Sequence, residues 1–209
     1  MERKCTVIIP AYNEEKTIAK VVKLVKKNSS DIVDQIIVVD NASTDNTGIK
    51  ADAADATVIR CKNKGKGYAM EDGLIYAKND VIAFLDADID NYSKDLIHTL
   101  VNPIFNKRAD FVKSMFEREG GRVTELVAKP LLEIKFPNMY KFSQPLSGMI
   151  AGRKEFFQKI QLEKGYGVDI GILLDMIKIG ARVEEVSIGK INNNSKQLLM
   201  LKDMAKQKI

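Results

Sequence analysis

Short apolar runs alternate with amphipathic stretches along the first half of the chain. The runs are rich in valine and isoleucine, as in strands buried on both faces of a sheet, and they cover residues 7–9, 35–39, 57–59 and 81–85. After the first run, apolar side chains recur at the spacing of one helix face, at Ile18, Val21, Val22 and Val25. This alternation predicts an α/β domain with a mostly parallel sheet flanked by helices.

The second half has a less regular pattern. Residues 109–115 and 183–188 predict strands, and residues 123–134 and 170–177 predict helices. In the first half, Pro10 is expected to end the first strand, and a further helix is expected from Ala69 to Ala77. No repeat, long linker or low-complexity segment divides the 209 residues, so we expect a single domain.

Polar side chains gather in three loops that follow predicted strands: Ala11–Glu15, Asn41–Asp45 and Asp86–Asp90. Open α/β sheets bind ligands at the carboxyl ends of their strands, so these loops predict a nucleotide-binding edge. Asp86-Ala87-Asp88 is the most informative, because two carboxylates at the end of a buried strand favour a bound cation. Oxygen ligands suit Mg²⁺ or Mn²⁺, although such a pair can also be a turn or a helix cap.

Two glycine-rich segments and one carboxylate are further candidates. Residues 63–67 combine glycines with Lys64 and Lys66 before a helix, which suits either phosphate binding or a plain basic turn. Residues 120–125 place Arg122 and Thr124 after two glycines, as in a site for a second anion or in a simple cap. Asp169 opens a helix, where it either complements the helix dipole or lies beside a reacting sugar.

Composition narrows the class of protein. The chain has 45% hydrophobic and 29% charged residues and a formal net charge of +5, which is mild for a nucleic-acid-binding protein. Cys5 and Cys61 lack metal-ligand spacing and suit buried thiols in a reducing compartment, and His98 is the only histidine. No apolar run reaches the roughly 20 residues of a membrane span, and no signal peptide is evident, so a cytoplasmic enzyme is expected.

The order and spacing of the strand-end motifs resemble the GT-A glycosyltransferases of family 2. The matching segments are residues 7–15, 38–45 and 84–88. The second half is similar to the glucosyl-3-phosphoglycerate synthase group of that family, in residues 112–114, 120–132, 144–148 and 165–171. The resemblance divides the domain into a nucleotide-binding half (1–90), an acceptor-binding half (91–190) and a tail (191–209).

The resemblance implies glucose transfer from UDP-glucose to 3-phosphoglycerate with retention at the anomeric carbon, with Mg²⁺ or Mn²⁺ as cofactor and a possible homodimer. It places the donor on Pro10, Ala11, Tyr12, Glu14, Asp40, Asn41, Ser43, Lys66, Asp86 and Ala87. It places the acceptor on Gly121, Arg122, Thr124, Ser147, Gly148 and Met149, the metal on Asp88, and the catalytic roles on Asp169 and Lys66.

One position departs from the family pattern. A histidine metal ligand is expected shortly after the last strand, and Asn193 occupies that position. An asparagine carbonyl also binds Mg²⁺, so Asn193 is a candidate ligand. Two other hypotheses stay open: a family 2 enzyme that acts on a polyprenyl phosphate or a cell-surface glycan, and a nucleotide-sugar-binding relative with impaired catalysis.

Overall fold

The computed structural model describes residues 3–89, 91–117, 130, 134, 142–165 and 167–191. The first half runs β1 (Cys5–Ala11), α1 (Ile18–Asn28), β2 (Val33–Asp40), α2 (Thr47–Asp52), β3 (Thr57–Arg60), α3 (Lys66–Tyr76) and β4 (Val81–Phe84). The second half contains α4 (Leu96–Phe105), β5 (Phe111–Glu117), β6 (Ile150–Arg153), α6 (Lys154–Phe157), α7 (Val168–Lys178) and β7 (Val183–Lys190). The alternation of strands and helices expected for the first half is confirmed.

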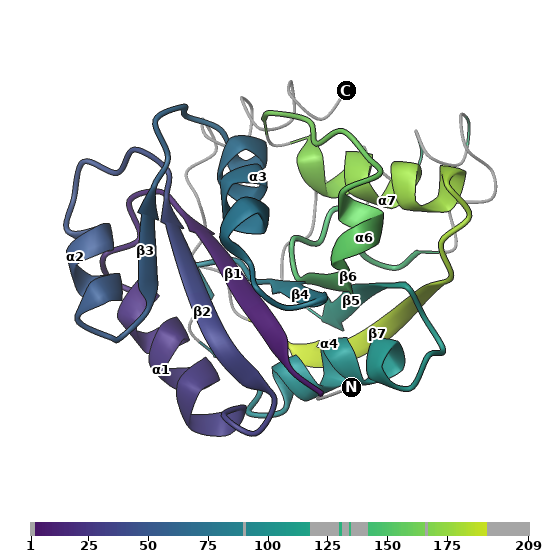
Figure 1. Ribbon diagram of the computed structural model, residues 1–209, viewed down its shortest axis with the longest axis horizontal. Helices are drawn as coiled ribbons and strands as arrows, with labels where there is room; N and C mark the ends of the chain where they lie inside the picture. Colours follow the sequence, from purple (N-terminus) through teal and green to yellow (C-terminus); the bar gives the residue numbers. More distant parts are fainter. Residues whose placement is uncertain are drawn as a thin grey trace.

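The described strands form one mixed sheet in the order β3-β2-β1-β4-β6-β5-β7 (Figure 1). Strands β1 to β4 are parallel, β6 runs antiparallel to both β4 and β5, and β5 is parallel to β7. In this register Ala11 lies opposite Asp40, and Ile8 lies opposite Phe84. The carboxyl ends of β1, β2 and β4 therefore meet at one edge, as the three polar loops require.

Each face of the sheet has its own apolar core. Side chains alternate along β1, so that Val7 and Ile9 join one core while Ile8 joins the other. Helices α1, α2 and α4 cover the first face, and α3, α6 and α7 cover the second (Figure 1). The fold is thus the three-layer arrangement that a parallel α/β sheet needs in order to bury both faces.

The structure corrects two of the expected boundaries. Strand β1 continues through Pro10 to Ala11. Even-numbered residues of β1 face β4, as the bond from the Leu85 N–H to the Ile8 carbonyl shows, and the ladder to β4 ends at Ile8. Pro10 has no N–H with which to continue the ladder towards β4, whereas the pairing with β2 continues, with Pro10 opposite Val39. Helix α3 begins at Lys66, three residues before the expected start. The helix expected at residues 123–134 lies almost entirely outside the described residues.

An ion cluster joins β5, β6 and β7 at the amino ends of β5 and β7, the end of the sheet away from the three polar loops. The Asp110 carboxylate accepts hydrogen bonds from Arg182 Nε (2.8 Å) and Nη2 (2.7 Å), and Arg153 Nε lies 3.3 Å from Asp110 Oδ1. The bonds from Arg182 lower the pKa of Asp110 to about 2, although partial burial opposes the shift. The carboxylate therefore stabilises the fold only while it is ionised.

We expect this cluster to set part of the acid stability. A depressed carboxyl pKa contributes stability that is present above the unfolded value of roughly 3.9 and is lost as the pH falls towards 2, amounting to about 2 kcal/mol. Asp110→Asn should therefore be less stable than the wild type at pH 7, and the difference should shrink between pH 4 and pH 2. Urea unfolding at several pH values measures it. A difference that is constant with pH would contradict the assignment.

Candidate functional site

The loops after β1 and β2 are joined by hydrogen bonds between main chain and side chain. The Asn13 N–H donates to Ser43 Oγ (3.0 Å), and the Thr44 N–H donates back to Asn13 Oδ1 (2.8 Å). The Glu14 N–H donates to Thr47 Oγ1 (2.8 Å) at the start of α2. Asn13 has a positive φ of 55°, a conformation that asparagine tolerates better than most residues. The two loops predicted to bind the nucleotide therefore form one surface.

Two buried side chains support that surface from below. The Asp40 carboxylate accepts a hydrogen bond from the Ser43 N–H (3.0 Å), and Asn41 Oδ1 accepts one from the Gly65 N–H (3.1 Å). Gly48 of α2 admits the aspartate, since a Cβ at Gly48 would lie 2.9 Å from Asp40 Oδ2. The structure thus gives Asp40 and Asn41 loop-holding roles, and their contact with a nucleotide stays a prediction.

Tyr12 is the partly exposed aromatic ring of this edge. Lys64 Nζ donates to the Tyr12 hydroxyl (2.9 Å) and lies 4.1 Å from the ring centroid, as in a cation–π contact. The basic loop is therefore tied both to Tyr12 and, through Gly65, to Asn41. An aromatic ring beside an ammonium group suits a nucleoside with an attached phosphate.

Lys66 is the centre of the site. Its Nζ lies 2.8 Å from Asp86 Oδ1, after β4, and 2.9 Å from Asp169 Oδ1, in the first turn of α7. Burial opposes the charge on the lysine, but the Asp169 and Asp86 carboxylates outweigh it and raise the pKa of Lys66. The raised value keeps the ammonium charged across the physiological range, and its stabilising contribution is lost only at strongly alkaline pH. Three residues chosen independently from the sequence thus form one charged cluster.

The glycines around Lys66 have a different role from the one expected. The Gly67 N–H donates to the Lys164 carbonyl (3.1 Å), and a Cβ at Gly67 would lie 1.7 Å from the Glu163 carbonyl oxygen. Gly65 has a φ of +151°, and its Cβ would lie 2.3 Å from the Lys164 carbonyl oxygen. The amides of Gly65 and Gly67 therefore bond within the protein, and the Lys64 and Lys66 side chains are the groups of this loop that reach the site.

We expect Gly67→Ala to destabilise the fold by about 1–3 kcal/mol, the usual cost of overpacking, because main-chain atoms cannot move aside as a side chain does. Gly171→Ala is the matched control: its Cβ would approach the same residue, Glu163, but only at the side-chain Cγ, 3.3 Å away. Urea unfolding compares the two. Equal stability of both variants would show that the main chain of residues 163–164 does not pack closely against Gly67.

Residues 147–149 border the lysine on its other side. A Cβ at Gly148 would lie 2.2 Å from Lys66 Nζ and 2.4 Å from Asp86 Oδ1, so the main chain touches the ion pair. The Ser147 hydroxyl lies 2.6 Å from Ser114 Oγ, and the Met149 side chain is buried in the apolar core. Any acceptor contact of this segment would therefore be made mainly by its main chain around Gly148.

The Asp86-Ala87-Asp88 turn follows β4 as the sequence predicts. The Tyr92 hydroxyl donates to the Asp86 carbonyl oxygen (2.9 Å). Burial raises the pKa of Tyr92, and the negative charges of the Asp86 and Asp88 carboxylates raise it further. Both carboxylates therefore lie near this hydroxyl, and Asp86 is already paired with Lys66. The partly exposed Asp88 offers oxygen atoms only, which fits a hard divalent cation such as Mg²⁺ or Mn²⁺.

No group of three or more metal-binding side chains occurs within the part of the chain that the structure describes. A metal at Asp88 would thus need further ligands from the substrate or from elsewhere in the chain, as Mg²⁺ sites on phosphates commonly do. Asn193 and the acceptor candidates Gly121, Arg122 and Thr124 lie outside the described residues, so their roles stay predictions.

Two buried residues that touch the site have no role predicted from the sequence. Tyr92 supports the turn after β4, and Lys113 on β5 donates to the Ser147 carbonyl (2.7 Å) and the Asp169 carbonyl (3.0 Å). A signal existed for the second, because a lysine flanked by apolar residues in a predicted strand is rarely left buried without a partner.

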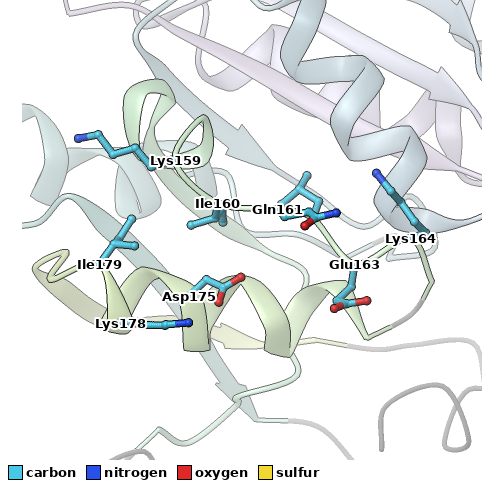
Figure 2. A pocket seen from close by; sticks show the side chains of 9 residues that line it. Lys159, Ile160, Gln161, Glu163, Lys164, Asp175, Lys178 and Ile179 are labelled. Carbon is cyan, nitrogen blue, oxygen red and sulfur yellow. The ribbon is translucent and has the colours of Figure 1, made fainter.

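A polar cavity of about 450 Å³ lies between residues 159–164 and the C-terminal half of α7 (Figure 2). Its lining includes Lys159, Glu163, Asp175 and Lys178. None of the site residues predicted from the sequence lines this cavity. It borders the segment that packs against Gly65 and Gly67, and it is separate from the Lys66 cluster.

Comparison with known proteins agrees with this geometry. The sequence model of Glycosyl transferase family 2 matches residues 6–160. The glucosyl-3-phosphoglycerate synthase of Mycolicibacterium smegmatis is 34% identical over 99% of this chain and 76% of the relative. A dolichol-phosphate mannosyltransferase of Pyrococcus furiosus is 28% identical over 82% of this chain and 52% of the relative.

Solved structures give the same assignment. The glucosyl-3-phosphoglycerate synthase of Mycobacterium tuberculosis in complex with phosphoglyceric acid superposes with a TM-score of 0.94 at 34% identity, over 99% of this chain and 77% of that chain. The complex of that enzyme with Mn²⁺, UDP-glucose and phosphoglyceric acid superposes with a TM-score of 0.93 at the same identity and coverage. The family model, the relatives and the fold agree, and the chain belongs to glycosyl transferase family 2, as a glycosyltransferase with the GT-A fold.

Proposed function

We propose that the enzyme transfers glucose from UDP-glucose to 3-phosphoglycerate, with Mg²⁺ or Mn²⁺ as cofactor and with retention at the anomeric carbon. The observation that carries the proposal is the position of Lys66 between Asp86 and Asp169, at the edge where the carboxyl ends of the parallel strands meet, since open α/β sheets bind their ligands there. The 34% identity to the glucosyl-3-phosphoglycerate synthase of Mycolicibacterium smegmatis supports the choice of substrates.

The donor would lie over the joined loops after β1 and β2. Tyr12 and the adjacent main chain of Pro10 and Ala11 would hold the uridine, with Glu14 and Ser43 at the rim. The Lys66 ammonium would face the diphosphate, where it would stabilise the negative charge that develops as the sugar–phosphate bond breaks. Because two carboxylates hold this ammonium in place, little reorganisation would be needed during the reaction.

Asp88 would hold the divalent cation together with the donor diphosphate, and Asn193 would supply a further oxygen. The cation supplies charge neutralisation at the leaving diphosphate. Tyr92 would keep the turn that carries Asp88 in position, since its hydroxyl is bonded to the Asp86 carbonyl. The all-oxygen donor set favours Mg²⁺ or Mn²⁺ over softer metals.

The acceptor would be held by its charges. Arg122 would bind the phosphate or carboxylate of 3-phosphoglycerate bidentately, with Gly121 and Thr124 beside it, and the main chain at Gly148 would border the sugar. Asp169 would orient the sugar or the acceptor hydroxyl. With retention, the acceptor hydroxyl attacks from the side that the diphosphate leaves, and a leaving-group oxygen takes its proton.

Nucleotide release tests the donor and the acceptor together. The purified enzyme is incubated with UDP-glucose, UDP-galactose, GDP-glucose or GDP-mannose, each with and without 3-phosphoglycerate and with Mg²⁺ or EDTA. We expect UDP release from UDP-glucose only when both 3-phosphoglycerate and Mg²⁺ are present. Release that requires a polyprenyl phosphate in vesicles would favour the alternative acceptor, and UDP binding without release in any mixture would indicate an impaired enzyme.

The metal assignment makes a separate prediction for Asn193. Imidazole binds Mn²⁺ more strongly than a neutral amide oxygen, so Asn193→His should lower the Mn²⁺ concentration for half-maximal activity several-fold. The maximal rate at saturating metal should change little. Titration of activity with Mn²⁺ measures both values, with Asn194→His as the neighbouring control. An unchanged metal requirement would remove Asn193 from the proposed ligands.

A further inference from the structure

Lys113 is a buried lysine whose contacts lie beneath the reaction site. It belongs to β5, where it pairs with Ile150 of β6 and Glu185 of β7, and its exposed fraction is 0%. A methionine of similar volume would fill this space without the cost of removing an ammonium group from water. The lysine therefore needs an explanation beyond packing, and its hydrogen bonds provide one.

The Lys113 ammonium connects two segments that are distant in the sequence. It donates to the Ser147 carbonyl (2.7 Å), one residue before Gly148, and to the Asp169 carbonyl (3.0 Å), in the first turn of α7. Asp169 is thus held at two points, its carbonyl by Lys113 and its carboxylate by Lys66. The long stem of the lysine carries the ammonium from β5 to both carbonyls.

Both segments also border the Lys66 amine. The Asp169 carboxylate lies 2.9 Å from Lys66 Nζ, and the Gly148 main chain is so close that a Cβ there would lie 2.2 Å from the same atom. A second contact fixes the turn at Ser147, whose hydroxyl lies 2.6 Å from Ser114 Oγ. A shift of either segment would change the position of Asp169 or Gly148 relative to Lys66 and Asp86.

We propose that Lys113 is a positioning residue for glycosyl transfer: its buried ammonium holds the main chain of Ser147 and Asp169 so that Gly148 and the Asp169 carboxylate flank Lys66. The inference rests on the proposed function for its reaction and deepens it. Lys113 touches neither substrate in this account and acts through Asp169 and the Gly148 turn. Its loss should therefore reduce the rate of transfer more than the binding of the nucleotide.

Lys113→Met tests the proposal, with Lys154→Met as the matched control. Lys154 is a partly buried lysine that also donates to a main-chain carbonyl, that of Ala77 (2.6 Å). It directly follows β6, beside the amino end of β4, and so lies at the end of the sheet away from the site. We expect Lys113→Met to lower kcat at least 50-fold while the Kd for UDP with Mn²⁺, measured by calorimetry, stays within threefold. Lys154→Met should keep kcat within twofold of the wild type.

Two results would overturn the proposal. One is a kcat of Lys113→Met within twofold of the wild type, and the other is a parallel loss of UDP affinity and kcat, which would indicate a general structural role. If Lys113→Met does not fold, Lys113→Gln keeps two N–H donors on a shorter side chain and is expected to bind UDP normally with a smaller loss of kcat. The same two outcomes would count against the proposal for this variant.

The wild-type arm separates this inference from the proposed function. If the wild type does not use 3-phosphoglycerate, the proposed function fails, and the inference about Lys113 is then judged on the crystal structure of Lys113→Met. In that structure we expect the Asp169 carboxylate to lie more than 4 Å from Lys66 Nζ. An ion pair that is unchanged from 2.9 Å would overturn the inference without reference to any substrate.

Discussion

Lys66→Met is expected to lower kcat by about 10²–10³, the usual effect of removing one pre-organised donor from a transition state, which corresponds to about 2.7–4 kcal/mol. The ammonium is fixed between Asp86 and Asp169, and methionine keeps the length of the side chain without the charge. The donor KM should change less than kcat, because the uridine-binding loops remain intact. Steady-state kinetics with UDP-glucose and 3-phosphoglycerate provide the measurement.

The same substitution should also weaken the fold. Two carboxylates that now share one ammonium would face each other without it, and at least one of them would take up a proton. The expected loss is about 3 kcal/mol, the low end of the range for a broken buried pair, since Asp86 keeps some contact with solvent. The stability of Lys66→Met should therefore fall further as the pH rises from 5 to 8, because proton uptake becomes harder.

Lys62→Met is the matched control for both measurements. Lys62 is an exposed lysine four residues earlier, on the same approach to α3, so its substitution should change stability by less than about 0.5 kcal/mol. If Lys66→Met and Lys62→Met have the same kcat, the Lys66 ammonium has no part in stabilising the leaving group.

Gly148→Ala is expected to lower kcat by about 10²-fold with little loss of UDP affinity. The new methyl group would occupy space within 2.4 Å of both Lys66 Nζ and Asp86 Oδ1, so at least one of these side chains must move. A displacement near 1 Å at a reacting group has an effect of this order. Because both displaced groups are side-chain ends, the fold itself should survive.

The measurement combines kinetics with calorimetry. A kcat within threefold of the wild type would show that the ion pair tolerates displacement, or that residue 148 lies away from the reacting atoms. A thermal unfolding curve accompanies the test, because a large drop in Tm would assign the effect to folding rather than to the position of Lys66.

Strands β1 to β4 and helix α1 could be predicted from the sequence because the patterns that indicate them are local. The apolar runs of β1 to β4 and the helix stripe of α1 each depend on neighbouring residues, so composition and period identify them. Strand β6 was not predicted, because it has no such local signal: Ile150–Arg153 is short and contains Ala151 and Gly152 at its centre, which leaves no periodic pattern to detect. Its antiparallel direction is set by its neighbours β4 and β5.

The site was predicted residue by residue but not as an arrangement. Lys66, Asp86 and Asp169 were each chosen from local motifs, while their meeting at one ammonium depends on the way α3, β4 and α7 pack. The amides of Gly65 and Gly67 bond within the protein, to Asn41 and Lys164, which the local motif did not indicate, and phosphate binding by the lysines of this loop stays a prediction. Contacts between segments so far apart in the sequence cannot be predicted from the pattern of neighbouring residues.

Product analysis tests the central claim most directly. The enzyme is incubated with UDP-[¹³C]glucose, 3-phosphoglycerate and Mg²⁺, and the anomeric carbon is followed by NMR. The account predicts an acceptor-dependent, EDTA-sensitive signal from an α-linked glucosyl phosphoglycerate, with the configuration of the donor retained. A β-linked product would contradict retention, and free glucose or unchanged UDP-glucose in the complete mixture would contradict the assigned reaction itself.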